Sequence, residues 1–156
     1  MKLRSTLMAA LAVSAVAMFS GCANMPGQHT IRAVSTDAAP KAIGPYSQAI
    51  RSGPMLFISG NLPINPATNQ LLKDASIEVQ TKQVLENIRA TLAAEGMTMA
   101  NVVSTSVFMQ DLNEFTKMNE VYASFFTGAT PARATVQVAR LPRDVKIEIG
   151  AIAIKP

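Results

Sequence analysis

The feature that most restricts the fold is the apolar segment Val145–Ile154, whose β-branched residues and length are typical of a strand. Side chains alternate between the two faces of a strand. One face of this strand carries Ile147, Ile149, Ala151 and Ala153. The other face carries Lys146, Glu148, Gly150, Ile152 and Ile154. Because both faces are at least partly apolar, a sheet that contains this strand needs a cover on each side.

Two segments have the spacing of amphipathic helices. The first is Ile77–Glu95, with Ser76 placed to cap its start and Gly96 its end. Its apolar face carries Val84, Leu85, Ile88 and Leu92. The second helix is expected to open at Asp111. Its apolar residues repeat at intervals of three and four and are expected in the core: Phe115, Met118, Tyr122 and Phe125.

The remaining apolar runs read as strands. They are Ser47–Arg51, Met55–Ser59, Val102–Met109, Ala134–Val138 and Val145–Ile154. A loop punctuated by Pro63, Pro66 and Asn69 precedes the first helix. The order β-β-α-β-α-β-β predicts a single α+β domain with a mixed sheet and both helices on one face. The other face then needs a second subunit as its cover.

The first 21 residues have the layout of a secretory signal. Lys2 and Arg4 precede an uncharged apolar run, Leu7–Phe19, which is shorter than the roughly 20 residues of a membrane-spanning helix. The sequence Phe-Ser-Gly-Cys at 19–22 resembles the lipobox of bacterial lipoproteins, although Phe19 stands where leucine is usual. That resemblance implies that Cys22, the sole cysteine, is lipidated and becomes the mature N-terminus. Alternatively, an ordinary signal peptide is cut after residues 15–17 and Cys22 is incidental.

We therefore expect a signal peptide over residues 1–21, a lipidated tether over 22–40 that ends in a short strand near Thr30–Ser35, and a folded domain over 41–156. In lipoprotein sorting patterns, Ala23 favours an outer-membrane anchor facing the periplasm. The expected location is thus the cell envelope, with the membrane contacted through the lipid.

Charge and composition exclude several classes of function. Without Lys2 and Arg4, 12 of the 14 basic residues remain against 10 acidic ones, so the net charge falls from +4 to +2. No basic run with interleaved aromatic residues occurs, which argues against a nucleic-acid partner. A single cysteine and a single histidine, His29 in the tether, leave no usual zinc site and no serine–histidine–aspartate triad.

Two charged residues stand out by their positions. Arg133 leads directly from a loop into a strand, and Glu148 lies inside the most apolar strand, where an unpaired charge is costly to desolvate. One interpretation is that Lys146 and Glu148 form a solvated strand face and that Arg133 is a loop cation. The other interpretation is a functional site.

Six blocks, in order, resemble the Rid family of imine deaminases, the RidA/YjgF group. They are Ile43–Gln48, Ser59–Pro63, Gln80–Asn87, Val107–Leu112, Pro131–Val136 and Ala139–Glu148. The resemblance implies a chorismate-mutase-like fold, assembled as a homotrimer with three clefts between subunits. It also implies a cofactor-free hydrolase of the 2-iminobutanoate/2-iminopropanoate deaminase type. Such an enzyme converts 2-imino acids, or enamines such as 2-aminoacrylate, to 2-oxo acids and ammonia.

The resemblance also assigns roles. Arg133 takes the place of the family arginine that binds the substrate carboxylate, and Glu148 would orient water and shuttle its proton. Further positions match residues that line the family's cleft: Tyr46, Ser59, Gly60 and Asn119. Thr135 stands where the family often has cysteine and is expected to contact substrate, and Asn61 stands where glutamine is common.

Other functions remain open on this fold. A non-catalytic envelope protein could use Arg133 to bind a small carboxylate, and a holdase-like protein would use its surface. Some members of the family have been described as ribonucleases, but the low net charge and the absence of a histidine near the fold oppose that function here.

Overall fold

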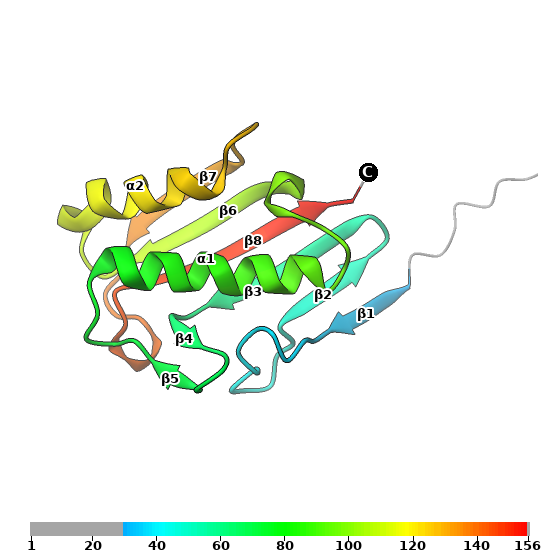
Figure 1. The fold of residues 1–156 in the computed structure, drawn as a ribbon, viewed down its shortest axis with the longest axis horizontal. Helices are drawn as coiled ribbons and strands as arrows, with labels where there is room; N and C mark the ends of the chain where they lie inside the picture. The colour runs from blue at the N-terminus through cyan, green and yellow to red at the C-terminus, as the bar shows by residue number, and fades with distance from the viewer. Residues whose placement is uncertain (1–29, 156) are drawn as a thin grey trace, which may run out of the picture.

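The computed structural model describes residues 30–155 and is built around one six-stranded sheet with the order β1-β2-β3-β8-β6-β7 (Figure 1). In that order the strands are Ile31–Val34, Ala49–Ser52, Met55–Asn61, Ile147–Ile154, Val102–Met109 and Ala132–Gln137. All neighbours are antiparallel except β6 and β7, which run parallel. The sheet is therefore mixed, as the order of elements predicts.

Both helices, α1 (Ile77–Ala93) and α2 (Phe115–Phe125), lie on the same face of this sheet (Figure 1). Helix α1 begins at the residue that follows Ser76, although the Ser76 side chain makes no capping hydrogen bond to the backbone. The chain leaves α1 through Gly96, whose φ of 62° is accessible without strain because glycine lacks a Cβ.

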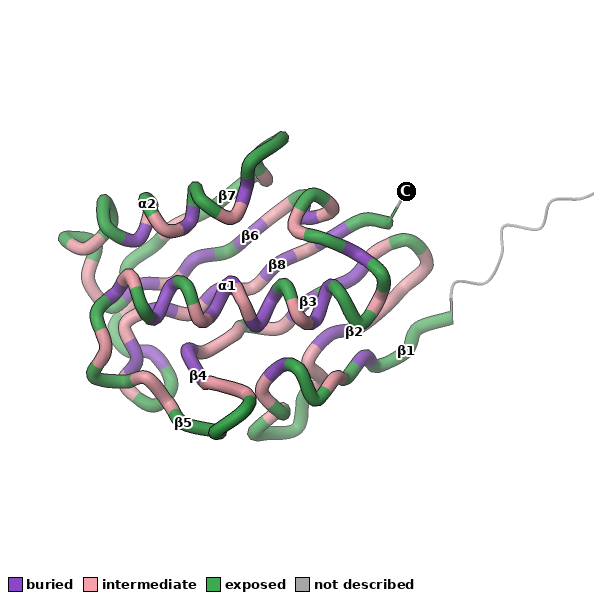
Figure 2. Tube along the Cα trace, in the orientation of Figure 1, coloured by how far each residue is buried: buried purple, intermediate pink, exposed green. Residues whose placement is uncertain are grey.

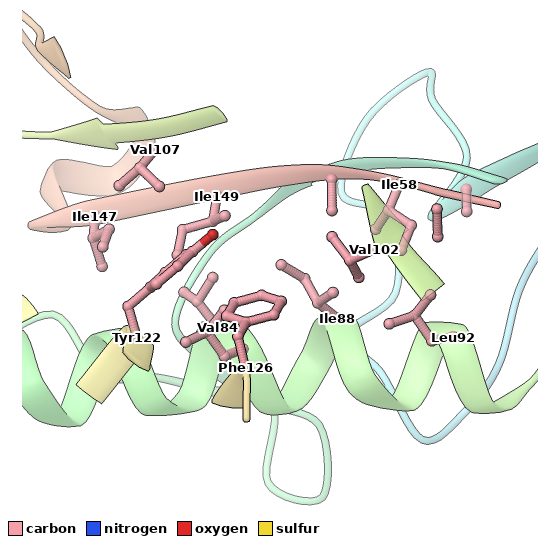
Figure 3. Packing of buried hydrophobic residues seen from close by; sticks show 14 of the residues in the cluster. Ile58, Val84, Ile88, Leu92, Val102, Val107, Tyr122, Phe126, Ile147 and Ile149 are labelled. Atoms are coloured by element: carbon pink, nitrogen blue, oxygen red, sulfur yellow. The ribbon is translucent and has the colours of Figure 1, made fainter. Parts of the chain in front are cut away.

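The alternation of β8 matches the sequence. The residues expected on the helix side, Ile147, Ile149, Ala151 and Ala153, are at most 5% exposed, whereas Ile154 on the other side is 40% exposed. Figure 2 shows the buried positions alternating with more accessible ones along the tube. Side chains of α1, α2 and β8 meet between the helices and the sheet (Figure 3). The core therefore lies on one side of the sheet only.

The opposite face of the sheet has no helix over it in residues 30–155 (Figure 1). By strand register its larger side chains are Ile31, Ile50, Met55, Phe57, Phe108, Val136, Ile152 and Ile154. Glu148 is the one ionisable side chain at the strand positions of this face. We call this surface the helix-free face.

Some elements differ from the prediction. The segment expected as a loop holds a small hairpin, β4 (Ile64–Asn65) and β5 (Gln70–Leu71). Its strands are too short to show alternation in a sequence. Strand β1 confirms the short strand expected at the end of the tether, and it pairs with β2, so the fold begins before residue 41.

The expectation that Phe115 is a core residue is wrong. Its side chain is 36% exposed and lies over the Arg133 guanidinium, because α2 reaches the edge strand β7 at this point. Phe125 is only partly buried, while Met118, Tyr122 and Phe126 fill the core.

The predicted signal segment, Cys22 and His29 lie outside the described residues. Within residues 30–155, no helix combines the length and the apolar character needed to span a bilayer.

Candidate functional site

The predicted site residues fall into two groups on opposite faces of the sheet. Glu148 lies between the core residues Ile147 and Ile149, so its side chain points to the helix-free face. Arg133 is in register with Thr105, whose buried side chain contacts α2, so Arg133 points to the helix side. One copy of the chain therefore does not bring these two residues together.

The first group, here the glutamate half-site, comprises Tyr46, Ser59, Gly60 and Glu148. Its geometry depends on an irregularity between β3 and β8, where Ile58 pairs with Ala151 but Asn61 pairs with Ile149. One extra residue on β3 is the signature of a β-bulge. The bulge places Gly60 beside the Glu148 carboxyl group.

Glycine at position 60 leaves room for the Glu148 carboxyl group where it lies in this structure. A Cβ built on it would lie 1.8 Å from Oε1 and 2.8 Å from the carboxyl carbon of Glu148. The Glu148 carboxylate thus occupies the space that a side chain at position 60 would fill.

An open cleft adjoins this group. Its lining comprises Pro40, Lys41, Ile43, Tyr46, Gln48, Ser59, Gly60, Asn61, Leu62 and Ile64. Gln48 holds one wall, because its Oε1 accepts from the Thr36 backbone N–H at 2.6 Å and its Nε2 donates to the Pro40 carbonyl at 2.7 Å. Ser59 donates through Oγ to the Ser47 carbonyl at 2.7 Å. Gln48 belongs to the first of the six family blocks, but its hydrogen bonds to Thr36 and Pro40 could not be predicted from the sequence.

Burial raises the pKa of the Glu148 carboxyl group above its ordinary value, because desolvation disfavours the charged form. No ion pair among the described residues includes Glu148. Lys146 instead donates to Glu114 at 2.8 Å and precedes β8. The structure therefore does not support a shared solvated strand face for Lys146 and Glu148.

The second group, here the arginine half-site, comprises Asn119, Arg133 and Thr135. Arg133 is exposed at the start of β7, and its Nη1 donates to Asn119 Oδ1 at 2.9 Å. Its guanidinium carbon lies 4.5 Å from the ring centroid of Tyr122 and 5.6 Å from that of Phe115. No carboxylate within residues 30–155 forms an ion pair with it. Its charge is therefore available to an anion from outside.

Thr135 lies two residues beyond Arg133 on the same side of β7. Its Oγ1 is buried and has no hydrogen-bond partner among the described residues. An unpaired buried hydroxyl is unfavourable unless another group bonds to it. Thr135 thus provides an unused donor beside the guanidinium.

The two rings on Arg133 are the part of the site that sequence reasoning missed. Phe115 and Tyr122 were assigned to the core, and their spacing on α2 equally allows a contact with a side chain at the sheet edge. As for metals, the described part of the chain contains no group of three or more His, Cys, Asp or Glu side chains that could hold an ion.

Comparisons with known proteins show which family the chain belongs to. The family described as Endoribonuclease L-PSP matches residues 36–155. A RutC family protein of Pyrococcus horikoshii is 53% identical over 122 residues, which cover 78% of this chain and 96% of that protein. A protein of Escherichia coli strain K12 named 2-iminobutanoate/2-iminopropanoate deaminase is 46% identical over 127 residues, covering 80% of this chain and 98% of that protein.

Solved structures give the same result. The crystal structure of E. coli TdcF with bound serine superposes with a TM-score of 0.77 at 42% identity, covering 80% of this chain and 99% of that one. The E. coli YjgF gene product has a TM-score of 0.77 at 44% identity, with 80% and 99% coverage. These neighbours confirm the predicted α+β fold with two helices on one sheet. The chain belongs to the Endoribonuclease L-PSP family, which includes the RutC and Rid proteins.

Proposed function

We propose that this protein hydrolyses 2-imino acids and their enamine tautomers to 2-oxo acids and ammonia. The observation that carries the proposal is the environment of Glu148, a half-buried carboxyl group with a raised pKa and no ion-pair partner among the described residues. A carboxyl group in this state is a better proton acceptor than an ordinary glutamate, so it can take a proton from water and return it. The deaminase name of the E. coli relative supports the same chemistry.

The reaction needs few groups. The fork of Arg133 binds the substrate carboxylate through paired N–H donors. A protonated imine carbon is already electrophilic, so water can attack it directly while Glu148 accepts a proton from that water. Glu148 then returns the proton to the amino nitrogen of the tetrahedral adduct. The carbon–nitrogen bond breaks as Glu148, again a carboxylate, takes the adduct's hydroxyl proton, which yields ammonia and the 2-oxo acid; the proton then passes from Glu148 to the ammonia, which leaves as ammonium.

Such a site requires more than one copy of the chain, because Arg133 and Glu148 point to opposite sheet faces. We propose a homotrimer in which each of three clefts combines the arginine half-site of one copy with the glutamate half-site of the next. The helix-free face supports this assembly, since it exposes Phe57, Val136 and Ile154 at 40% or more. Because each is only about 40% exposed, burying the remainder contributes roughly 0.6–1.3 kcal/mol each to an interface.

The deaminase proposal is tested by generating 2-iminobutanoate with an amino-acid oxidase and following its decay with the purified full-length protein. We expect Glu148→Gln to lower kcat on the order of 100-fold, because the amide cannot take a proton. Arg133→Lys should raise KM about tenfold or more, because lysine lacks the paired donors.

Matched controls are available for both variants. Glu86→Gln and Arg89→Lys alter an exposed ion pair on α1, in which Arg89 also lies over the ring of Phe125, so both should keep wild-type rates. If 2-iminobutanoate decays no faster with the protein than without it, the proposed enzymatic activity is refuted. The alternative of a non-catalytic carboxylate-binding protein, which needs only Arg133, would then remain.

Gly60→Ala is expected to inactivate the protein without unfolding it. The new methyl group must displace the Glu148 carboxyl group, and a displacement of about 1 Å in a catalytic group costs on the order of 100-fold in rate. Gly150→Ala is the control, because a Cβ there meets nothing nearer than 3.5 Å. The rates of the two variants are compared after circular dichroism has confirmed their fold. Equal rates would show that the close approach of Gly60 to Glu148 has no catalytic role.

The shared cleft is tested by mixing two inactive variants. When Arg133→Ala chains, which lack the carboxylate-binding group, and Glu148→Gln chains are unfolded together and refolded in equal amounts, roughly a quarter of the clefts should combine two intact half-sites from different copies. We expect the mixture to regain about that share of wild-type activity. A mixture no more active than its parents, with mixed trimers shown by native mass spectrometry, would contradict the shared cleft.

For location, we propose a lipid anchor at Cys22 that holds the domain at the cell envelope, facing the periplasm from the outer membrane. The lipobox-like sequence and the signal layout of residues 1–21 support it. In cells fed radiolabelled palmitate, Cys22→Ser should abolish both the label and membrane fractionation. Label retained on the Cys22→Ser protein would contradict the anchor.

A further inference from the structure

Arg133 is held in place by uncharged groups from one face of α2. Phe115, Asn119 and Tyr122 follow each other at intervals of four and three, so they line one side of the helix. Together they offer the guanidinium two aromatic rings and one amide oxygen. The arrangement orients a cation without neutralising it.

The Tyr122 ring is itself fixed by the core. It is 5% exposed, and its hydroxyl makes a 2.7 Å hydrogen bond with the buried Thr105 Oγ1. The ring also packs against Phe126 at a centroid distance of 4.7 Å. Figure 3 shows Tyr122 extending from α2 towards the sheet. Because Thr105 is the register partner of Arg133, the same core position anchors the ring and lies beside the arginine.

The choice of partners has a physical consequence. A carboxylate would also hold Arg133, but it would compete with a carboxylate ligand for the same N–H groups. Aromatic faces attract a guanidinium group through its flat side. Most of its five in-plane donors are then left free, because Asn119 takes only one.

We propose that Tyr122, with a smaller part played by Phe115, is a positioning residue that sets the plane of the Arg133 guanidinium group for bidentate carboxylate binding. The inference rests on the proposed function only in taking a 2-oxo or 2-imino acid as the ligand. It predicts that the rings act on ligand affinity rather than on the chemical step.

The test measures two quantities on the full-length protein: the dissociation constant of 2-oxobutanoate by calorimetry, and KM and kcat for 2-iminobutanoate. Tyr122→Leu removes the ring and should raise the dissociation constant and KM about tenfold while kcat changes less than about twofold. Tyr122→Phe keeps the ring and should lie nearer to wild type than to Tyr122→Leu. Phe115→Leu removes an exposed ring and should weaken ligand binding by a few fold. If Tyr122→Leu does not fold, Phe115→Leu tests the proposal in its place.

Phe125→Leu is the matched control. It removes a partly buried ring of the same helix whose cation–π contact is with Arg89 and not with Arg133, so it should lower stability without changing affinity. Equal weakening in Tyr122→Leu and Phe125→Leu, or unchanged affinity in both Tyr122→Leu and Phe115→Leu, would overturn the proposal. If the wild-type protein binds 2-oxobutanoate more tightly than Tyr122→Leu does but hydrolyses no imine, the proposed deaminase activity is refuted. The proposed positioning role of Tyr122 is then still supported.

Discussion

The alternation of side chains along β8 determines what each face of this protein can do. Ile147 and Ile149 are buried in the core between the sheet and the helices, and Glu148 between them is thereby forced to the helix-free face. A carboxyl group among apolar neighbours is only partly solvated, which raises its pKa. The requirement to build a one-sided core therefore also produces the raised pKa of the glutamate.

The two half-sites have opposite electrostatic requirements. Glu148 benefits from being left without a cation, since an ion pair would favour its charged form and weaken it as a proton carrier. Arg133 benefits from being held by rings and an amide, since a carboxylate partner would occupy the donors that a ligand needs. Separating them on opposite faces keeps them apart until two copies meet. In the proposed trimer, the apolar surface around Glu148 is both part of an interface and the wall of a cleft.

Much of this arrangement could be predicted from the sequence. The two faces of β8, the extent of β6 and the start of α1 follow from local periodicity, which a sequence shows directly. The family blocks identified Arg133 and Glu148 as the chemical groups, though nothing in the sequence alone placed them on opposite faces.

The remaining features depend on pairing between distant segments. The bulge that sets Gly60 against Glu148 exists only in the register of β3 with β8. The exposed position of Phe115 depends on where α2 begins over the sheet edge, and helical spacing does not reveal that. Thr135 gives no hint in the sequence that its hydroxyl is buried without a partner.

The most direct test of the central claim is a crystal structure of the assembled protein with 2-oxobutanoate bound. We predict that the ligand carboxylate lies on Arg133 of one copy and that Glu148 of a neighbouring copy lies within hydrogen-bond reach, directly or through one water, of the ligand's C2 oxygen. A ligand held by Arg133 with no Glu148 from another copy near its C2 atom would contradict the account.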